Sequence, residues 1–237
     1  MNFLESVIAY SNGEDLEEDK YSIQAAAMGC YLVILCMAIQ MGNNHLDSLK
    51  SGLQLSITQI AHSRENLSEK GIMELRSVTL PFFERIFILN PQETLSFACA
   101  HMSTDLFMDR MVASMDYLNN SSVRKLNLLV ICRLLEIVTP SALIPVFESF
   151  LRHAIPEVRR AEEAAVQPER KVQKNRKGEY SQRRESFQQT ISPSTHNLVQ
   201  EWRQALRHFE ERIRTAGLTL PPLSDPGLQE QVLVYLK

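Results

Sequence analysis

The stretch MDRMVASMDYLNNSSVRKLNLLVICRLLEIV, residues 108–138, predicts two helices joined by a short polar turn. The turn is the Asn119–Ser121 segment, and asparagine and serine are typical turn residues. Residues 126–138 are apolar at almost every position, so the second helix has no wholly polar face. A helix of this kind is stable only where neighbours cover it on most sides. The stretch therefore predicts an array of packed helices.

The composition of the whole chain also favours helices. Of 237 residues, 44% are hydrophobic, while only 8 are glycine and 10 are proline. Leucine, methionine, alanine, glutamate and glutamine are frequent, and all are good helix formers. No segment alternates polar and apolar residues as a half-buried strand does. The formal net charge of −3 argues against a wholly basic nucleic-acid-binding protein.

Helical segments recur in pairs along the chain. The pairs cover residues 45–89, residues 91–138 and the segment that begins at residue 141, a period of roughly 35–45 residues. Such a period predicts an all-α, HEAT-type helical solenoid of antiparallel helix pairs that wind into a right-handed superhelix. We expect residues 1–160 to form this array and residues 161–195 to be a charged, disordered insertion. Residues 196–237 are expected to be terminal helices that close the array.

One apolar run, IQAAAMGCYLVILCMAIQMG at residues 23–42, carries no charge and approaches the length of a membrane span. Two glutamines bracket it, and it lacks the closely flanking basic residues that are typical of a membrane helix. The sequence therefore predicts a central, fully buried helix and no membrane insertion.

The residue types that hold metals or carry out catalysis are scattered. The four cysteines form no C-x-x-C pair, and the six histidines form no H-x-x-x-H pair. We expect all four cysteines to be buried, reduced thiols, with no metal and no cofactor. Asp105 and Asp109 stand one helical turn apart, but Asp105 is better explained as a helix-start residue. No phosphate loop, dinucleotide fingerprint or nucleophile elbow is present, so we do not expect an enzyme.

The most distinctive charged segment lies between residues 170 and 184. Its basic residues are Arg170, Lys171, Lys174, Arg176, Lys177, Arg183 and Arg184. Such a segment could bind an acidic protein partner, act as a nuclear-localisation-like signal, or be a solvated linker. The C-terminal LQEQVLVYL has leucine-rich spacing like that of an export signal, although a terminal capping helix explains it better.

Two stretches together resemble a known family: LFMDRMVASMDYLNNSSVRKLNLLVICRLLEIV and the following TPSALIPVFESFL. They are similar to a HEAT repeat from the C-terminal half of importin-β-type karyopherins, nearest the importin-eleven branch. In that family one helix ends in an aspartate and an aromatic or hydrophobic residue, here Asp116 and Tyr117. A polar turn and a basic pair follow, here Arg124 and Lys125. The resemblance is clearest over residues 68–155.

The resemblance implies a nucleocytoplasmic transport receptor for nuclear import, resident in cytoplasm and nucleus, including the nuclear pore. Its partners would be protein cargo, the Phe-Gly repeats of the pore and the Ran GTPase. The family's main Ran-binding repeats lie near the N-terminus of much longer chains, so we expect that site to be absent and the chain to be a C-terminal segment. The alternative is a HEAT-repeat scaffold subunit of another complex with no transport role.

Overall fold

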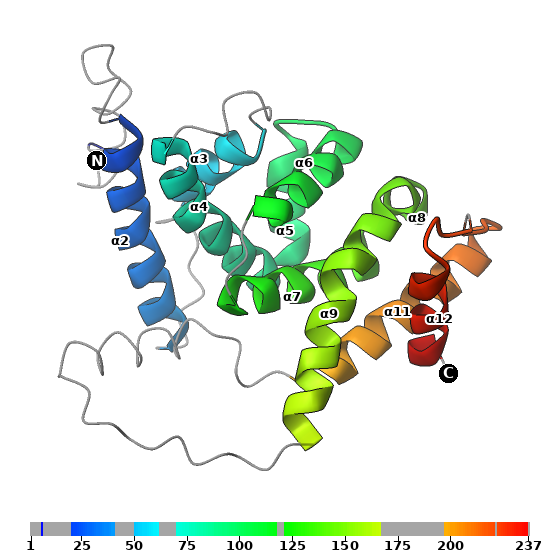
Figure 1. The fold of residues 1–237 in the computed structure, drawn as a ribbon. Helices are drawn as coiled ribbons and strands as arrows, with labels where there is room; N and C mark the ends of the chain where they lie inside the picture. Colours follow the sequence, from blue (N-terminus) through cyan, green and yellow to red (C-terminus); the bar gives the residue numbers. More distant parts are fainter. Residues whose placement is uncertain are drawn as a thin grey trace. The chain divides into compact units, whose positions relative to one another are not determined.

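The computed structural model describes residues 6, 20–40, 50–61, 70–117, 121–166, 197–220 and 222–236. Within these ranges the regular structure is entirely helical and contains no strand, which confirms the all-α prediction (Figure 1). The chain divides into two compact units, Met1–Ser114 and Met115–Lys237.

The first unit is built around a central helix, α4. Its elements are α2 (Lys20–Gln40), α3 (Lys50–Ala61), α4 (Lys70–Leu89), α5 (Pro91–Cys99) and most of α6 (Thr104–Tyr117). The α4 helix packs against α2, α3 and α5, and Figure 1 shows α2 and α4 side by side. Pro81 lies inside α4, which continues through it as one helix.

Aromatic side chains fill the space around α4. Tyr31 of α2 meets Phe82 edge-on, with ring centroids 6.0 Å apart. Phe83 lies 5.8 Å from Phe107 of α6 in a similar geometry. Edge-to-face pairs of this kind add to the stabilisation that burial provides. Gly52 lets α3 approach this cluster, because a Cβ atom there would lie 3.0 Å from the Phe82 ring.

The prediction that the apolar helix near residues 23–42 is buried on all sides is wrong. Met28, Tyr31 and Leu35 of α2 are buried, but Val33 and Ile34 are 38% and 44% exposed. Thus α2 packs through one face and presents apolar side chains on the other. No helix among the described residues is long and apolar enough to cross a membrane.

Three further predictions about individual side chains also need correction. Leu106, expected to face inward from α6, is 41% exposed, whereas Met111 and Met115 are buried as predicted. Cys30 is exposed and Cys99 is only partly buried, so of the described thiols Cys132 alone is fully buried. The side chain of Cys36 lies outside the described part of the structure.

The second unit has α7 at its centre. Its elements are α7 (Ser121–Ile137), α8 (Pro140–Leu143), the 3-10 turn η4 (Ile144–Val146), α9 (Phe147–Val166), α11 (Leu198–Thr215) and α12 (Pro226–Leu236). The α7 helix packs against both α9 and α11, which also contact each other. Residues 126–132 of α7 are all buried, which confirms that this helix is covered on most sides. The α9 helix continues six residues past the predicted end at residue 160.

The α11 helix follows its predicted apolar stripe closely. Trp202, Leu206, Phe209 and Ile213 are all buried, at spacings of three and four residues. Phe209 contacts Phe147 of α9 with ring centroids 5.1 Å apart. The α12 helix packs on α9 and α11 through Val232 and Tyr235.

Candidate functional site

The seven basic residues between Arg170 and Arg184 lie outside the described residues. The binding role predicted for Arg170, Lys171, Lys174, Arg176, Lys177, Arg183 and Arg184 stays a prediction. The described helices of the second unit carry two clefts.

The basic pair that opens α7 contributes to packing between helices. Arg124 forms an ion pair with Glu157 of α9, whose side chain is only 4% exposed. Arg160, one turn further along α9, pairs with the same carboxylate. A buried carboxylate needs such partners, because an unpaired buried charge is strongly destabilising. Arg124 therefore joins α7 to α9.

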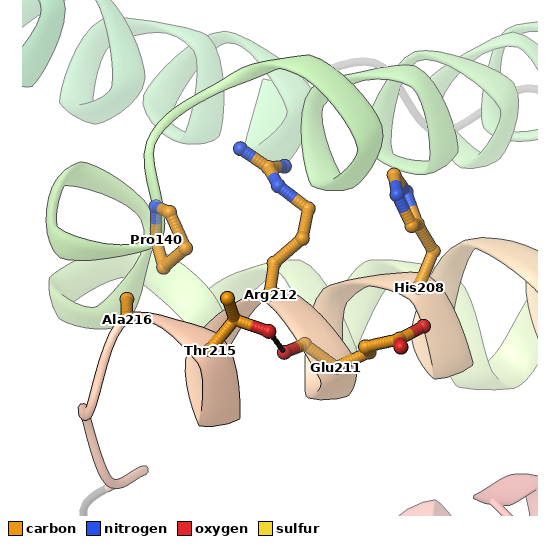
Figure 2. A pocket seen from close by; sticks show the side chains of 6 residues that line it. All are labelled: Pro140, His208, Glu211, Arg212, Thr215 and Ala216. Carbon is orange, nitrogen blue, oxygen red and sulfur yellow. Dashed lines mark hydrogen bonds between the residues drawn. The ribbon is translucent and has the colours of Figure 1, made fainter.

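A first cleft, of about 450 Å³, lies beside the end of α7 (Figure 2). Its lining residues are Pro140, His208, Glu211, Arg212, Thr215 and Ala216. Figure 2 shows the Arg212 and His208 side chains extending from α11 on the same side of that helix. The Nη1 and Nη2 atoms of Arg212 donate to the carbonyl oxygens of Leu135 and Val138, each at 2.8 Å.

Polar groups of this first cleft form hydrogen bonds with backbone carbonyls of the helices. The last carbonyls of a helix lack partners within it, and a cation at that end is favoured by the helix dipole. Arg212 supplies hydrogen-bond donors to these carbonyls and a positive charge at that end, so its guanidinium caps α7. The Thr215 hydroxyl donates to the Glu211 carbonyl at 2.8 Å, as Figure 2 shows. Among these six lining residues, no hydroxyl is hydrogen-bonded to His208 as a nucleophile would be to its base.

A second cleft, of about 400 Å³, lies between α9 and α12. It is lined by Arg152, Ile155, Pro156, Arg159, Arg160, Glu163, Leu228 and Gln231. We call it the α9–α12 groove. Three arginines and one glutamate give it a cationic rim, while Ile155, Pro156 and Leu228 supply an apolar floor. Grooves that combine an apolar floor with a few charged groups are suited to binding peptides.

Hydrogen bonds hold the two walls of the α9–α12 groove together at both ends. At one end, Glu148 of α9 accepts hydrogen bonds from Arg152 Nη2 at 2.7 Å and from the Ser224 backbone N–H at 2.9 Å. The Arg152 bond first, and then those from Ser224, lower the pKa of Glu148 from 4.5 to about 2. The carboxylate is therefore charged at neutral pH and holds the segment before α12 against α9.

At the other end, Tyr235 of α12 is fixed to α9 and α11. Its hydroxyl donates to Glu162 at 3.1 Å, and the Arg203 guanidinium lies 5.9 Å from the ring centroid. Burial, followed by the bond to Glu162, raises the pKa of Tyr235. The groove is thus preformed, and a ligand would not need to order its walls.

Neither a metal site among the described residues nor a family assignment emerges. No group of three or more potential metal ligands is present among the residues that the structure describes. No protein-family model, no curated protein and no solved structure matches the chain.

The α9–α12 groove was not predicted from the sequence. A partial signal was present in RHAIPEVRRAEE, residues 152–163, where arginines recur seven and eight residues after Arg152. That spacing puts Arg152 and Arg159 on one face of a helix. The glutamates among them dilute the net charge, and only the position of α12 turns this face into a groove.

Proposed function

We propose that the chain is a protein-binding segment whose helices stack in pairs, as in HEAT repeats. The observation that carries this proposal is the packing of α7 against both α9 and α11, which also contact each other. In a repeat array each helix contacts chiefly the helices of the adjacent repeat, and the assembly offers a long surface to partners. Arg124 contributes to such stacking, because it joins α7 to the next long helix through Glu157.

We further propose that this segment belongs to a nucleocytoplasmic transport receptor of the karyopherin type. The support is the resemblance over residues 106–151, with Asp116 and Tyr117 before the turn and Arg124 and Lys125 after it. Its partners would be protein cargo and the Phe-Gly repeats of the nuclear pore, with the Ran GTPase bound by repeats outside this chain.

Entry into nuclei tests the transport role. The chain is fused to a carrier protein too large for passive diffusion and added to permeabilised cells. The fusion should reach the nuclear interior faster than the carrier alone or the carrier fused to an unrelated helical protein, because Phe-Gly binding carries a receptor through the pore. Equal entry rates for the three proteins would contradict the transport role.

The second candidate function is a scaffold subunit of another complex, without transport. Exposed apolar side chains on α12 favour it: Leu233 and Val234 are 50% and 63% exposed. Apolar surface of this kind is common where one subunit packs permanently against another. This candidate predicts stoichiometric co-purification with one partner and no facilitated nuclear entry.

A further inference from the structure

The α9–α12 groove has an excess of arginine that ion pairs within the protein do not fully use. Arg152 pairs with Glu148, and Arg160 shares Glu157 with Arg124. Arg159 is exposed and has no ion pair with any residue that the structure describes. Each guanidinium carries five N–H donors, so even a paired arginine can donate further hydrogen bonds.

The floor of the groove is apolar and partly open. Ile155 is 2% exposed and forms its base, while Pro156 is exposed and Leu228 of α12 is half-buried. A single aliphatic or aromatic side chain placed against Pro156 and Leu228 would lose water from its own surface and from theirs. That burial favours binding, because apolar surface is removed from water.

Pro156 also interrupts the backbone hydrogen bonding of α9 beside this floor. Proline has no backbone N–H, so the carbonyl oxygen of Arg152, four residues earlier in α9, receives no helical hydrogen bond from it. Both residues line the groove. The groove thus combines guanidinium donors with an apolar floor, which together match the carboxylates and an apolar side chain of a peptide.

We propose that the α9–α12 groove binds an acidic peptide segment of a partner protein, in which one apolar residue is flanked by aspartates or glutamates. The apolar residue occupies the floor at Pro156 and Leu228, and the carboxylates bind Arg152, Arg159 and Arg160. Charge complementarity selects this partner over a neutral one. A nucleic acid would use the arginines but has no need of the apolar floor. This assignment does not depend on the transport role.

Fluorescence anisotropy with the full chain tests the proposal. The probe is a short fluorescein-labelled peptide with one leucine flanked on both sides by glutamates and aspartates. Arg159→Glu should weaken its binding about fivefold, because an attractive charge becomes repulsive. The matched control is Arg207→Glu on α11, another exposed arginine without a described ion pair, which should bind as the wild type does. Circular dichroism confirms that each variant is folded.

A gain in affinity gives the sharper test, since misfolding cannot produce it. Glu163 is the acidic residue that lines the groove, and it is exposed. Glu163→Gln removes a repulsive charge and should strengthen peptide binding about twofold to threefold. In addition, replacing the leucine of the probe with alanine should weaken binding to the wild-type chain.

Several results would overturn the proposal. These are equal losses in Arg159→Glu and Arg207→Glu, no gain in Glu163→Gln, or equal binding of the leucine and alanine probes. A single-stranded oligonucleotide that binds as tightly as the peptide and responds equally to Arg159→Glu would assign the groove to nucleic acid instead. Failure of the nuclear-entry experiment would leave these outcomes unchanged, so the two proposals fail separately.

Discussion

Gly217 ends α11 in a conformation that other residues rarely adopt. Its φ is 65°, the only positive φ among the described residues. Its N–H donates a hydrogen bond to the Arg214 carbonyl oxygen at 3.1 Å, and the Leu218 N–H donates to the Ile213 carbonyl oxygen at 3.0 Å. These two hydrogen bonds and the positive φ are typical of a glycine-dependent helix ending.

Gly217→Ala should therefore destabilise the second unit by about 1 kcal/mol, through backbone strain alone, because a Cβ atom there would meet nothing within 4 Å. Gly29→Ala is the same chemical change inside α2, also in open space. It should stabilise the first unit by roughly 0.5–1 kcal/mol, because alanine favours the helix. Urea denaturation followed by circular dichroism measures both. Shifts of the same sign would contradict this explanation.

Glu84 of α4 has no exposed surface, and burial raises its pKa well above 4.5, with partial opposition from the charge of Arg85. At a pH above the pKa that Glu84 has in the unfolded chain, the unfolded chain loses the carboxyl proton of Glu84 while the folded chain retains it. The folded state then binds more protons, so stability falls as pH rises from about 4.5 toward the folded pKa.

Glu84→Gln copies the protonated side chain and should remove this pH dependence, which reaches about 1.4 kcal/mol per pH unit for one proton. We expect the variant to melt at a higher temperature than the wild type at neutral pH and to lose that advantage near pH ~4.5. Thermal melts at several pH values provide the measurement. Parallel pH profiles for the two proteins would show that Glu84 is ionised in the folded state.

At the scale of elements, the sequence predicted helices better than it predicted their faces. The α11 helix was predictable because Trp202, Phe209 and Ile213 form one stripe on an otherwise polar helix. The α2 helix is apolar on all sides, so periodicity could not tell that Val33 and Ile34 would be exposed. Capping by a distant side chain, as Arg212 caps α7, leaves no local signal in either helix.

The Arg212 cap can be tested with a matched pair on one helix. Arg212→Gln loses two charge-assisted hydrogen bonds at the end of α7 and should cost about 1–2 kcal/mol of unfolding free energy. Arg207→Gln, at an exposed position, should change it by less than about 0.5 kcal/mol. Trp202 is the only tryptophan and is buried in α11, so its fluorescence during urea denaturation reports on this unit. Equal effects of the two substitutions would argue against a capping role.

At the scale of the molecule, the sequence predicted the class of fold but not the candidate site. The all-α architecture follows from composition and periodicity, which each segment carries by itself. The α9–α12 groove depends on where residues 226–236 pack, and this is decided by distant partners such as Glu148 for Ser224 and Glu162 for Tyr235. A cluster of basic residues within one segment, as at 170–184, is visible in a sequence, whereas arginines gathered by folding are not.

Affinity for Phe-Gly repeats tests most directly the proposed transport role of this helical segment. The chain is passed over immobilised Phe-Gly repeats and over matched repeats in which serine replaces phenylalanine. We predict binding to the Phe-Gly surface alone, since the phenylalanine rings would have to enter apolar sites between helices. Equal binding to both surfaces, or to neither, by a chain with a helical spectrum and a cooperative melt would contradict that role.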